Sequence, residues 1–269
     1  MAASRNKIYL IFTFTLTWLL WWILAYLTQA ELVDLQSGLG QALFITGGSA
    51  PTIGAYVAVI LTKKEGSLKE FHSRVLKVRV NYKFYIFAIL VPVGLGIIGL
   101  AIASILDSQY LHDNPIQPIF LFIPFFFVSI LMGGLEEFGW RGVLQPSLQN
   151  RLNMVLVNFV IGITWALWHL PLFYISGSGQ EGNPFFLYAL AAIGFSAFMT
   201  WLYAKTSSIF LCVLFHASIN ATAITGLSVI MEHSAAYTYT AISIFAAGLL
   251  FLLISQGKSK QPKANTGGR

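Results

Sequence analysis

The sequence predicts an all-α protein that crosses a membrane about eight times, and three observations lead to this fold class. The chain has 269 residues, of which 57% are hydrophobic and only 10% are charged, and its mean hydropathy is +0.73. Soluble domains carry about 25% charged residues. Apolar windows of about 20 residues recur along the chain, which is the length that spans a bilayer as a helix. The basic residues also fall in alternate connections between these windows.

Each apolar window is expected to form one spanning helix of a helical bundle. The predicted bounds are residues 8–28, 41–62, 82–106, 117–138, 153–175, 184–204, 207–230 and 237–255. The first window has a short basic lead and ends near a Thr-Gln-Ala sequence, as a signal peptide does. Its apolar stretch is longer than such peptides use, so we expect a retained helix. The windows together predict a single transmembrane domain over residues 1–255.

The charges in the connections predict the orientation of the bundle. All 16 Lys and Arg residues lie in the N-terminal lead or after the second, fourth, sixth or eighth window, and the other connections contain only acidic charges. By the positive-inside rule, both termini are then cytoplasmic. Residues 66–80, "GSLKEFHSRVLKVRV", place apolar and basic residues at helical spacing, which predicts a helix on the membrane surface. The tail, residues 256–269, is basic and polar, which is typical of disorder.

The net charge of +6 raises the question of which negatively charged partner the protein contacts. Because the basic residues follow the topology of the chain, the lipid bilayer explains them and no nucleic-acid partner is predicted. The single cysteine, Cys212, excludes an intramolecular disulfide and lies in an apolar run, where it is expected to be a packing residue. The compact chain favours an integral, multi-pass protein of a prokaryotic plasma membrane.

Three ionisable groups stand in "LMGGLEEFGWRG", residues 131–142, directly after an apolar run. They are Glu136, Glu137 and Arg141, and each one costs several kcal/mol if it is left unpaired in a bilayer. Two later windows also carry polar groups, in "WALWH" and "HASIN". A helix rises 1.5 Å per residue, so the depth of each group can be counted from the nearest basic residue at the membrane surface, Arg151 or Lys205. The depths are about 22 Å for Glu136, 27 Å for His169, 16 Å for His216 and 22 Å for Asn220. Polar groups at one level from three helices indicate a site.

Spacing within each helix suggests the role of each side chain. Glu137 and Arg141 are four residues apart on one helix face, so they are expected to pair and support the site. Glu136 points about 100° away from Glu137 and has no such partner in the sequence, which leaves it for chemistry. His216 and Asn220 are also four apart, so both can point at one position.

These side chains form a set suited to peptide hydrolysis. Glu136 and a neutral His169 can hold and deprotonate a water molecule, while His216 and Asn220 can donate to an oxyanion. The catalytic candidates are therefore Glu136, His169, His216 and Asn220. No cofactor is favoured, but zinc bound by Glu136, His169 and His216 stays open, although the chain lacks a His-Glu-x-x-His motif.

The same side chains are also compatible with a non-catalytic immunity or interaction protein, which acts by binding, and with a proton-coupled transporter. Buried His and Glu residues often have a purely structural role, and intramembrane Glu and His residues also form the proton relay of a transporter. No internal repeat supports the transporter.

The three motifs, in this order and spacing, resemble the CAAX prenyl protease and bacteriocin-processing family, the type II CAAX endopeptidases. "EEFGWRG" is similar to the family's Glu-Glu-x-x-x-Arg motif, "WALWH" to an aromatic residue four before a histidine, and "HASIN" to His-x-x-x-Asn. The resemblance covers residues 40–255. The sequence departs from the family at Trp165, where Phe is commoner.

The resemblance implies an intramembrane endopeptidase with a catalytic core at about residues 117–230 and a cavity that opens toward the cytoplasm and lipid. Its substrate would be a protein or peptide, lipidated or embedded in the membrane. In eukaryotic members it is a prenylated C-terminus, and the substrates of prokaryotic members are often unknown. It implies that Glu136 and His169 activate water, that His216 and Asn220 stabilise the oxyanion, and that Glu137 and Arg141 brace the site. The family has been described both as metal-dependent and as a metal-free glutamate type. A non-catalytic bacteriocin self-immunity protein that acts by binding stays open.

Overall fold

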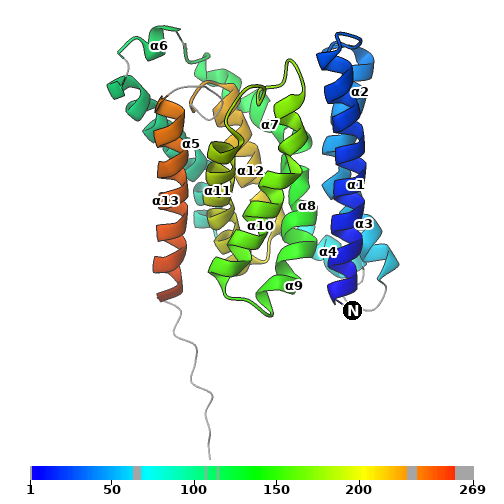
Figure 1. Cartoon of the computed structure of the whole chain (residues 1–269). Coiled ribbons are helices and arrows are strands. Elements are labelled where there is room, and N and C mark those ends of the chain that lie inside the picture. The colour runs from blue at the N-terminus through cyan, green and yellow to red at the C-terminus, as the bar shows by residue number, and fades with distance from the viewer. Residues whose placement is uncertain (1, 63–67, 107, 114, 229–234, 258–269) are drawn as a thin grey trace, which may run out of the picture.

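The structure, a computed structural model, describes residues 2–62, 68–106, 108–113, 115–228 and 235–257 as a bundle of helices (Figure 1). No strand occurs in these residues, which confirms the predicted all-α class. The longer helices are α1 (Ala2–Gln29), α2 (Gly38–Gly48), α3 (Ala50–Leu61), α5 (Tyr82–Leu106), α7 (Phe122–Met132), α10 (Met154–Trp168), α11 (Phe185–Thr206), α12 (Ile209–Ile224) and α13 (Ala235–Gly257). The shorter helices are α4 (Leu68–Val75), α6 (Tyr110–Asp113), α8 (Glu137–Gly139) and α9 (Gln145–Gln149).

All eight predicted spans correspond to helical segments, but two of them differ from a simple spanning helix. Six segments of the described chain are long and apolar enough to cross a membrane. The second predicted span is the pair α2 and α3, bent by 42° at its break, and the seventh is α12, which has only 16 residues. Most of the predicted tail, residues 258–269, lies outside the described residues.

Local sequence signals explain where several of these helices begin and end. Asn153 caps α10 by accepting a hydrogen bond from the backbone of Leu156, at 2.9 Å, and Ser208 caps α12 in the same way. Between α11 and α12, Ser207 adopts a left-handed conformation with φ of 51° and so ends α11. Pro51 in the first turn of α3 cannot donate a backbone hydrogen bond, so α2 does not run straight on.

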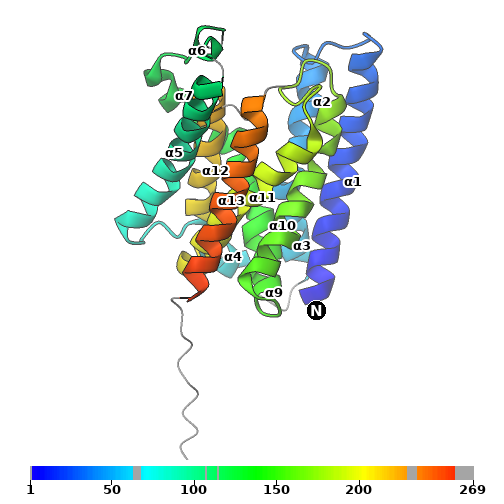
Figure 2. The same ribbon diagram turned by 60° about the vertical axis from the view of Figure 1, so that its left-hand side comes forward.

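Helices α11 and α12 lie at the centre of the bundle, with α10 and α13 packed on α11 and with α5 and α7 packed on α12 (Figures 1 and 2). At the crossing of α11 and α13, a Cβ on Gly194 or on Gly248 would overlap the opposite backbone. Small residues of this kind let membrane helices approach closely. The central position of α11 and α12 makes them a rigid support for polar groups inside the bundle.

The surface helix predicted after the second span is α4, at the end of the bundle that also holds the N-terminus (Figure 1). Its apolar residue Phe71 is fully buried, and its basic residue Arg74 donates hydrogen bonds to the carbonyl oxygen of Gly142 at 3.1 Å and to the hydroxyl of Tyr203 at 2.7 Å. The helix is therefore packed onto the bundle and is not detached from it.

Candidate active site

The fourth span is broken where the sequence places its two glutamates. Helix α7 ends at Met132, a 3₁₀ turn (Gly134–Glu136) and α8 follow, and residues Trp140–Leu144 form a π-helical turn before α9. π-Helical turns are rare and occur frequently at functional sites. A Cβ on Gly133, at the break, would overlap the side-chain amide nitrogen of Asn220. The break thus brings the glutamates against α12.

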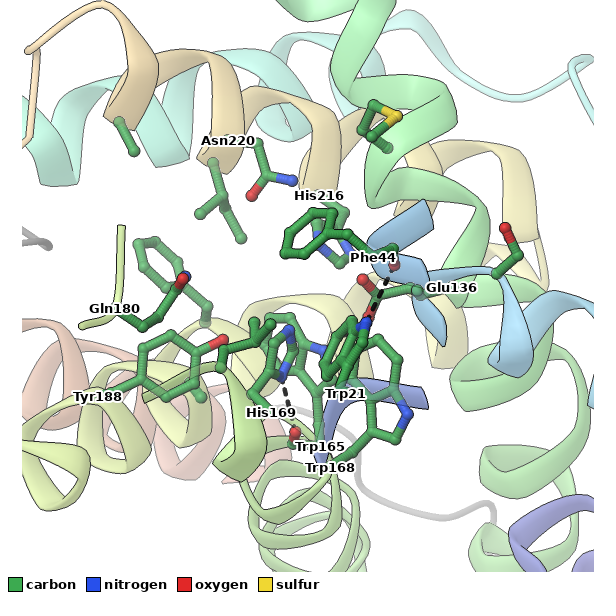
Figure 3. Close-up of a pocket in the computed structure, with 18 of the residues that line it drawn as sticks. Trp21, Phe44, Glu136, Trp165, Trp168, His169, Gln180, Tyr188, His216 and Asn220 are labelled. Atoms are coloured by element: carbon green, nitrogen blue, oxygen red, sulfur yellow. Dashed lines mark hydrogen bonds between the residues drawn. The ribbon is translucent and has the colours of Figure 1, made fainter. Parts of the chain in front are cut away.

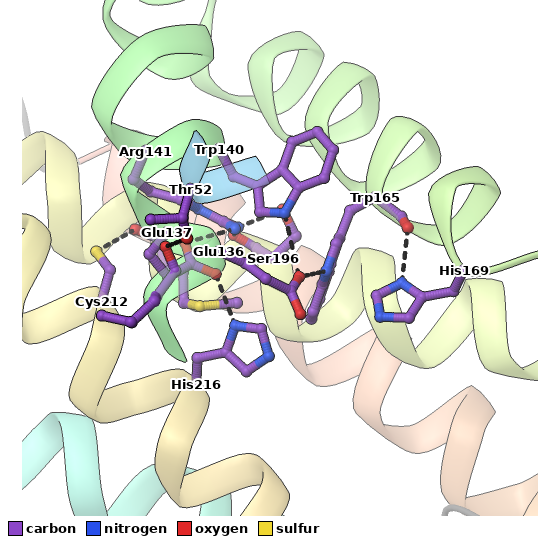
Figure 4. A network of polar contacts seen from close by, with 12 residues as sticks. Thr52, Glu136, Glu137, Trp140, Arg141, Trp165, His169, Ser196, Cys212 and His216 are labelled. Carbon is purple, nitrogen blue, oxygen red and sulfur yellow. Dashed lines mark hydrogen bonds and ion pairs between the residues drawn. The ribbon is translucent and has the colours of Figure 1, made fainter. Parts of the chain in front are cut away.

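Glu137 belongs to a buried charge network that connects α8, α11 and α12 (Figure 4). Its Oε2 forms an ion pair with Nη1 of Arg141 at 2.9 Å, and its Oε1 accepts a hydrogen bond from Nδ1 of His216 at 2.8 Å. Arg141 in turn donates from Nη2 to the hydroxyl of Ser196 at 2.9 Å. The predicted pair of Glu137 and Arg141 is confirmed, and its charges are compensated within the bundle, as buried charges require.

Glu136 points away from this network and is held by two indole groups (Figure 4). Its Oε2 accepts hydrogen bonds from Nε1 of Trp165 at 2.9 Å and from Nε1 of Trp140 at 3.3 Å. Its second oxygen, Oε1, has no hydrogen-bond partner among the described residues. One oxygen is therefore fixed by the protein, and the second is left for a ligand or a water molecule.

His169 follows directly after α10 and has a defined orientation. Its Nδ1 lies 2.9 Å from the carbonyl oxygen of Trp165, which can only accept, so Nδ1 carries the proton. The ring packs edge to face on Trp168, with centroids 4.5 Å apart, and on Tyr188, at 5.3 Å. Nε2 is then an unprotonated acceptor, which is the form that a general base needs.

A cavity of about 200 Å³ joins these groups (Figure 3). The predicted residues Glu136, His169, His216 and Asn220 all line it, whereas Glu137 and Arg141 lie behind its wall. On one side the cavity is bounded by Ile45 of α2 and by Leu131 and Met132 of α7, which are 42%, 70% and 47% exposed on the outside of the bundle. In a membrane, this side faces lipid.

Sequence reasoning missed several residues of the cavity wall, which are Trp21, Phe44, Trp168, Gln180 and Tyr188. Trp21 belongs to the run "LWW", which is expected to serve ordinary packing or lipid contact. It is nearly buried, and its Nε1 donates to the carbonyl oxygen of Phe44 at 3.0 Å, which fixes α1 against α2. Gln180 and Tyr188 stand in no motif, so only the fold reveals them.

The zinc site that the sequence leaves open would use Glu136, His169 and His216. Among the residues that the structure describes, no three or more His, Cys, Asp or Glu side chains are arranged to hold a metal ion. Nδ1 of His216 bonds to Glu137, and Nδ1 of His169 bonds to a carbonyl oxygen. These bonds leave Nε2 of each histidine as the nitrogen that could bind a metal, because zinc-binding histidines commonly donate their other ring nitrogen to a carboxylate or a carbonyl oxygen. Zinc binding by Glu136, His169 and His216 stays a prediction.

The charge pattern and the family resemblance predict different membrane sides for the open end of the cavity. Gln180, from the connection between α10 and α11, and Tyr188, near the start of α11, line the cavity at one end. This connection is one of those that contain no Lys or Arg. The resemblance implies a cavity open to the cytoplasm, whereas the charge pattern predicts that this end faces away from it.

A family model and a curated relative both connect the chain to the same family. The model described as type II CAAX prenyl endopeptidase Rce1-like matches residues 118–222, a region that contains all four predicted catalytic residues. The chain is 30% identical over 230 residues to CAAX prenyl protease 2 of Methanococcus maripaludis, covering 80% of this chain and 82% of that protein.

More distant similarity connects the chain to proteins named lysostaphin resistance protein A. Identity to the Staphylococcus haemolyticus protein is 24% over 251 residues, covering 91% of this chain and 66% of the relative. Identity to the Staphylococcus aureus protein is 25% over 219 residues, covering 77% of this chain and 49% of the relative. The chain thus spans only one half to two thirds of these relatives.

Proposed function

The chain belongs to the type II CAAX prenyl endopeptidase Rce1-like family, and from this premise we propose that it is an intramembrane endopeptidase in which Glu136 and His169 activate water. The substrate in this proposal is a lipidated or membrane-embedded peptide. One observation carries the assignment. Glu136 and His169 are each fixed through one polar atom, and each has a second polar atom with no partner among the described residues, on the wall of one cavity.

The proposed hydrolysis proceeds by direct attack of water on the scissile amide. Oε1 of Glu136 takes a proton from the water while Nε2 of His169 accepts a hydrogen bond from it and orients it. The water oxygen bonds to the carbonyl carbon, and the carbonyl oxygen becomes an oxyanion. The C–N bond then breaks, and the proton held by Glu136 passes to the leaving amine.

His216 and Asn220 are proposed to stabilise the oxyanion. Both line the cavity, one turn apart on α12. Because Nδ1 of His216 bonds to the carboxylate of Glu137, the imidazolium form of His216 is compensated, and its Nε2–H can donate into the cavity. The amide of Asn220 supplies a second donor. Fixed donors at a developing negative charge commonly contribute about 10²–10³-fold to a rate.

The variant Glu136→Gln tests this proposal. We expect it to lower the cleavage rate of a lipidated C-terminal peptide or a single-span peptide in proteoliposomes by about 10²–10⁴-fold. The thermal unfolding temperature should stay close to that of the unchanged protein, because the amide oxygen still accepts from Trp165. Glu181→Gln, at an exposed loop glutamate, is the matched control and should cleave normally. A Glu136→Gln protein that cleaves at the original rate contradicts the assignment.

A second candidate function rests on the similarity to the two lysostaphin resistance proteins. In this case the chain protects a cell by binding, without cleavage. Expression of the Glu136→Gln variant separates the two functions, because a binding protein would keep its full protective effect and a peptidase would lose it. We favour the peptidase, since a binding protein has no need of a carboxylate oxygen and an imidazole nitrogen that line one cavity and have no partner among the described residues.

A further inference from the structure

Two polar side chains of the cavity wall have no role in the proposed chemistry and no partner in the protein. Apart from the four catalytic candidates, the wall holds four polar side chains that donate hydrogen bonds within the protein, and they are Trp21, Ser49, Trp165 and Trp168. Gln180 and Tyr188 differ from these. Neither the amide of Gln180 nor the hydroxyl of Tyr188 has a hydrogen-bond partner among the residues that the structure describes, and both groups point into the cavity (Figure 3).

The position of the Tyr188 hydroxyl is fixed by aromatic packing. The ring of Tyr188 packs edge to face on His169 and on Phe173, and the centroids are 5.3 Å apart in both pairs. These two contacts restrict the ring on different sides, so the hydroxyl is held in place without a hydrogen bond of its own. It stands beside His169 and across the cavity from Glu136 (Figure 3).

Gln180 is positioned by the hydrogen bonds of the connection between α10 and α11. The hydroxyl of Ser178 donates to the carbonyl oxygen of Leu172 at 2.7 Å, which ties this connection to the end of the preceding helical segment. The backbone of Asn183 donates to the carbonyl oxygen of Gln180 at 3.1 Å and closes a turn. The main chain of Gln180 is therefore engaged in the turn, and its side-chain amide is left for the cavity.

The chemistry of these two groups suits a peptide backbone. A peptide in the cavity brings N–H and C=O groups on both sides of the scissile bond, and these groups must be paired once water is displaced. Most other side chains of the wall are apolar and cannot pair them. A hydroxyl and a carboxamide can each donate and accept, so they can bind a backbone of any sequence. Among the described residues, no Lys or Arg lines the cavity, which argues against a carboxylate or a phosphate as the bound group.

We propose that Gln180 and Tyr188 form a backbone subsite, which holds the substrate peptide beside the scissile bond, and that the hydroxyl of Tyr188 donates to a backbone carbonyl oxygen there. Trp165 contacts both Glu136 and His169, and His169 contacts Tyr188. Tyr188 is thus separated from the carboxylate that takes the proton, which fits a group that positions the peptide and takes no part in proton transfer. A subsite needs a bound peptide, so this assignment rests on the proposed function.

The variant Tyr188→Phe tests the subsite, because it keeps the ring against His169 and removes only the hydroxyl. We expect KM for a single-span peptide in proteoliposomes to rise about 3–10-fold, the effect of one neutral hydrogen bond. The value of kcat should stay close to the original, as it does when an interaction of equal strength in the bound substrate and the transition state is lost. Gln180→Met, which keeps the length of the side chain, should act in the same direction. Tyr174→Phe is the matched control, since Tyr174 is 47% exposed and does not line the cavity.

Peptides with a backbone ester next to the scissile amide, on one side or on the other, show whether the hydroxyl binds the backbone. An ester carbonyl is a weaker acceptor than an amide carbonyl. For the peptide in which the ester replaces the acceptor of Tyr188, the change Tyr188→Phe should therefore have little further effect on KM. A loss in kcat of the same size for every peptide would mean that Tyr188 only supports His169, and an unchanged KM in both subsite variants would also overturn the proposal.

Binding measured in the Glu136→Gln protein separates the subsite from the proposed chemistry. We expect the affinity of this protein for the same single-span peptide, labelled with a fluorophore, to fall about 3–10-fold when Tyr188→Phe is added. This measurement needs no cleavage, so a failure of the proposed hydrolysis does not affect it. Equal affinities with and without the hydroxyl of Tyr188 would contradict the subsite, whatever the cleavage assay shows.

Discussion

Glu137 and His216 are 79 residues apart in the chain, and their side chains form a buried hydrogen bond of 2.8 Å between Oε1 and Nδ1. The second oxygen of the same carboxylate holds Arg141 at 2.9 Å. The orientation of His216 in the cavity therefore depends on a charge network that does not itself line the cavity. Stability and activity should respond differently when members of this network are changed.

Arg141→Met is predicted to be strongly destabilising, because it leaves the carboxylate of Glu137 buried without its cation. The expected loss of unfolding free energy is about 3–5 kcal/mol. The double variant Glu137→Gln/Arg141→Met removes both charges and should recover a large part of this loss. Thermal unfolding in detergent measures both. If the double variant is destabilised by the sum of the losses of Arg141→Met and Glu137→Gln measured singly, the two residues have no energetic coupling.

Trp165→Phe should reduce catalysis by removing the shorter of the two hydrogen bonds to Glu136. A hydrogen bond to a charged group contributes about 1.5–3 kcal/mol, so kcat/KM is expected to fall roughly 10–100-fold. Trp18→Phe is the control, because Nε1 of Trp18 donates to the backbone oxygen of Trp168, at 3.3 Å. Equal rate losses in the two variants would mean that the indole bond to the carboxylate has no special role.

Gly133→Ala is predicted to impair the oxyanion site. The added Cβ would overlap the amide nitrogen of Asn220 and come within 3.2 Å of Nε2 of His216, so both donors must shift. Gly94→Ala in α5 is the matched control, since its Cβ would meet nothing within 4 Å, and alanine in a helix should stabilise by about 0.5–1 kcal/mol. We expect peptide cleavage to fall at least about tenfold for the first variant only, from the cost of displacing one donor. Full activity of Gly133→Ala would contradict the prediction that the positions of Asn220 and His216 are critical for the oxyanion site.

Removal of metal ions by a chelator is predicted to leave the activity unchanged. In the proposed mechanism the base is the carboxylate of Glu136, and the imidazole of His169 orients the water, so no metal ion is required. The measurement is peptide cleavage by purified protein after prolonged treatment with EDTA or phenanthroline, compared with a zinc peptidase treated in parallel. Loss of activity that added zinc restores would contradict the metal-free mechanism, and a different arrangement of Glu136 and the two histidines would then be required.

The sequence predicts the spans well because apolar windows and charge alternation are properties of the chain itself. It also predicts the pair Glu137 and Arg141, since a spacing of four residues in a helix fixes which side chains meet. Ser49 and Pro51 mark the break between α2 and α3, although a hydropathy window averages over such a local signal. For α12, the window of residues 207–230 overestimates a helix that ends at Ile224.

The surroundings of Glu136 were beyond sequence reasoning, because they depend on packing between helices. Trp165 reaches the carboxylate only because α10 lies beside the broken fourth span. The π-helical turn at Trp140–Leu144 has no sequence pattern that distinguishes it from an α-helix. Gln180 lies in the connection between α10 and α11, and Tyr188 lies near the start of α11. Both line the cavity, but neither belongs to a sequence motif.

The hydrogen bond from Arg74 to the carbonyl oxygen of Gly142 has a mechanical consequence. Gly142 follows Arg141 in the chain, so a displacement of α4 must either break this bond or pull on the backbone that carries the guanidinium. The position of α4 at the end of the bundle is thereby coupled to the charge network deep in the protein.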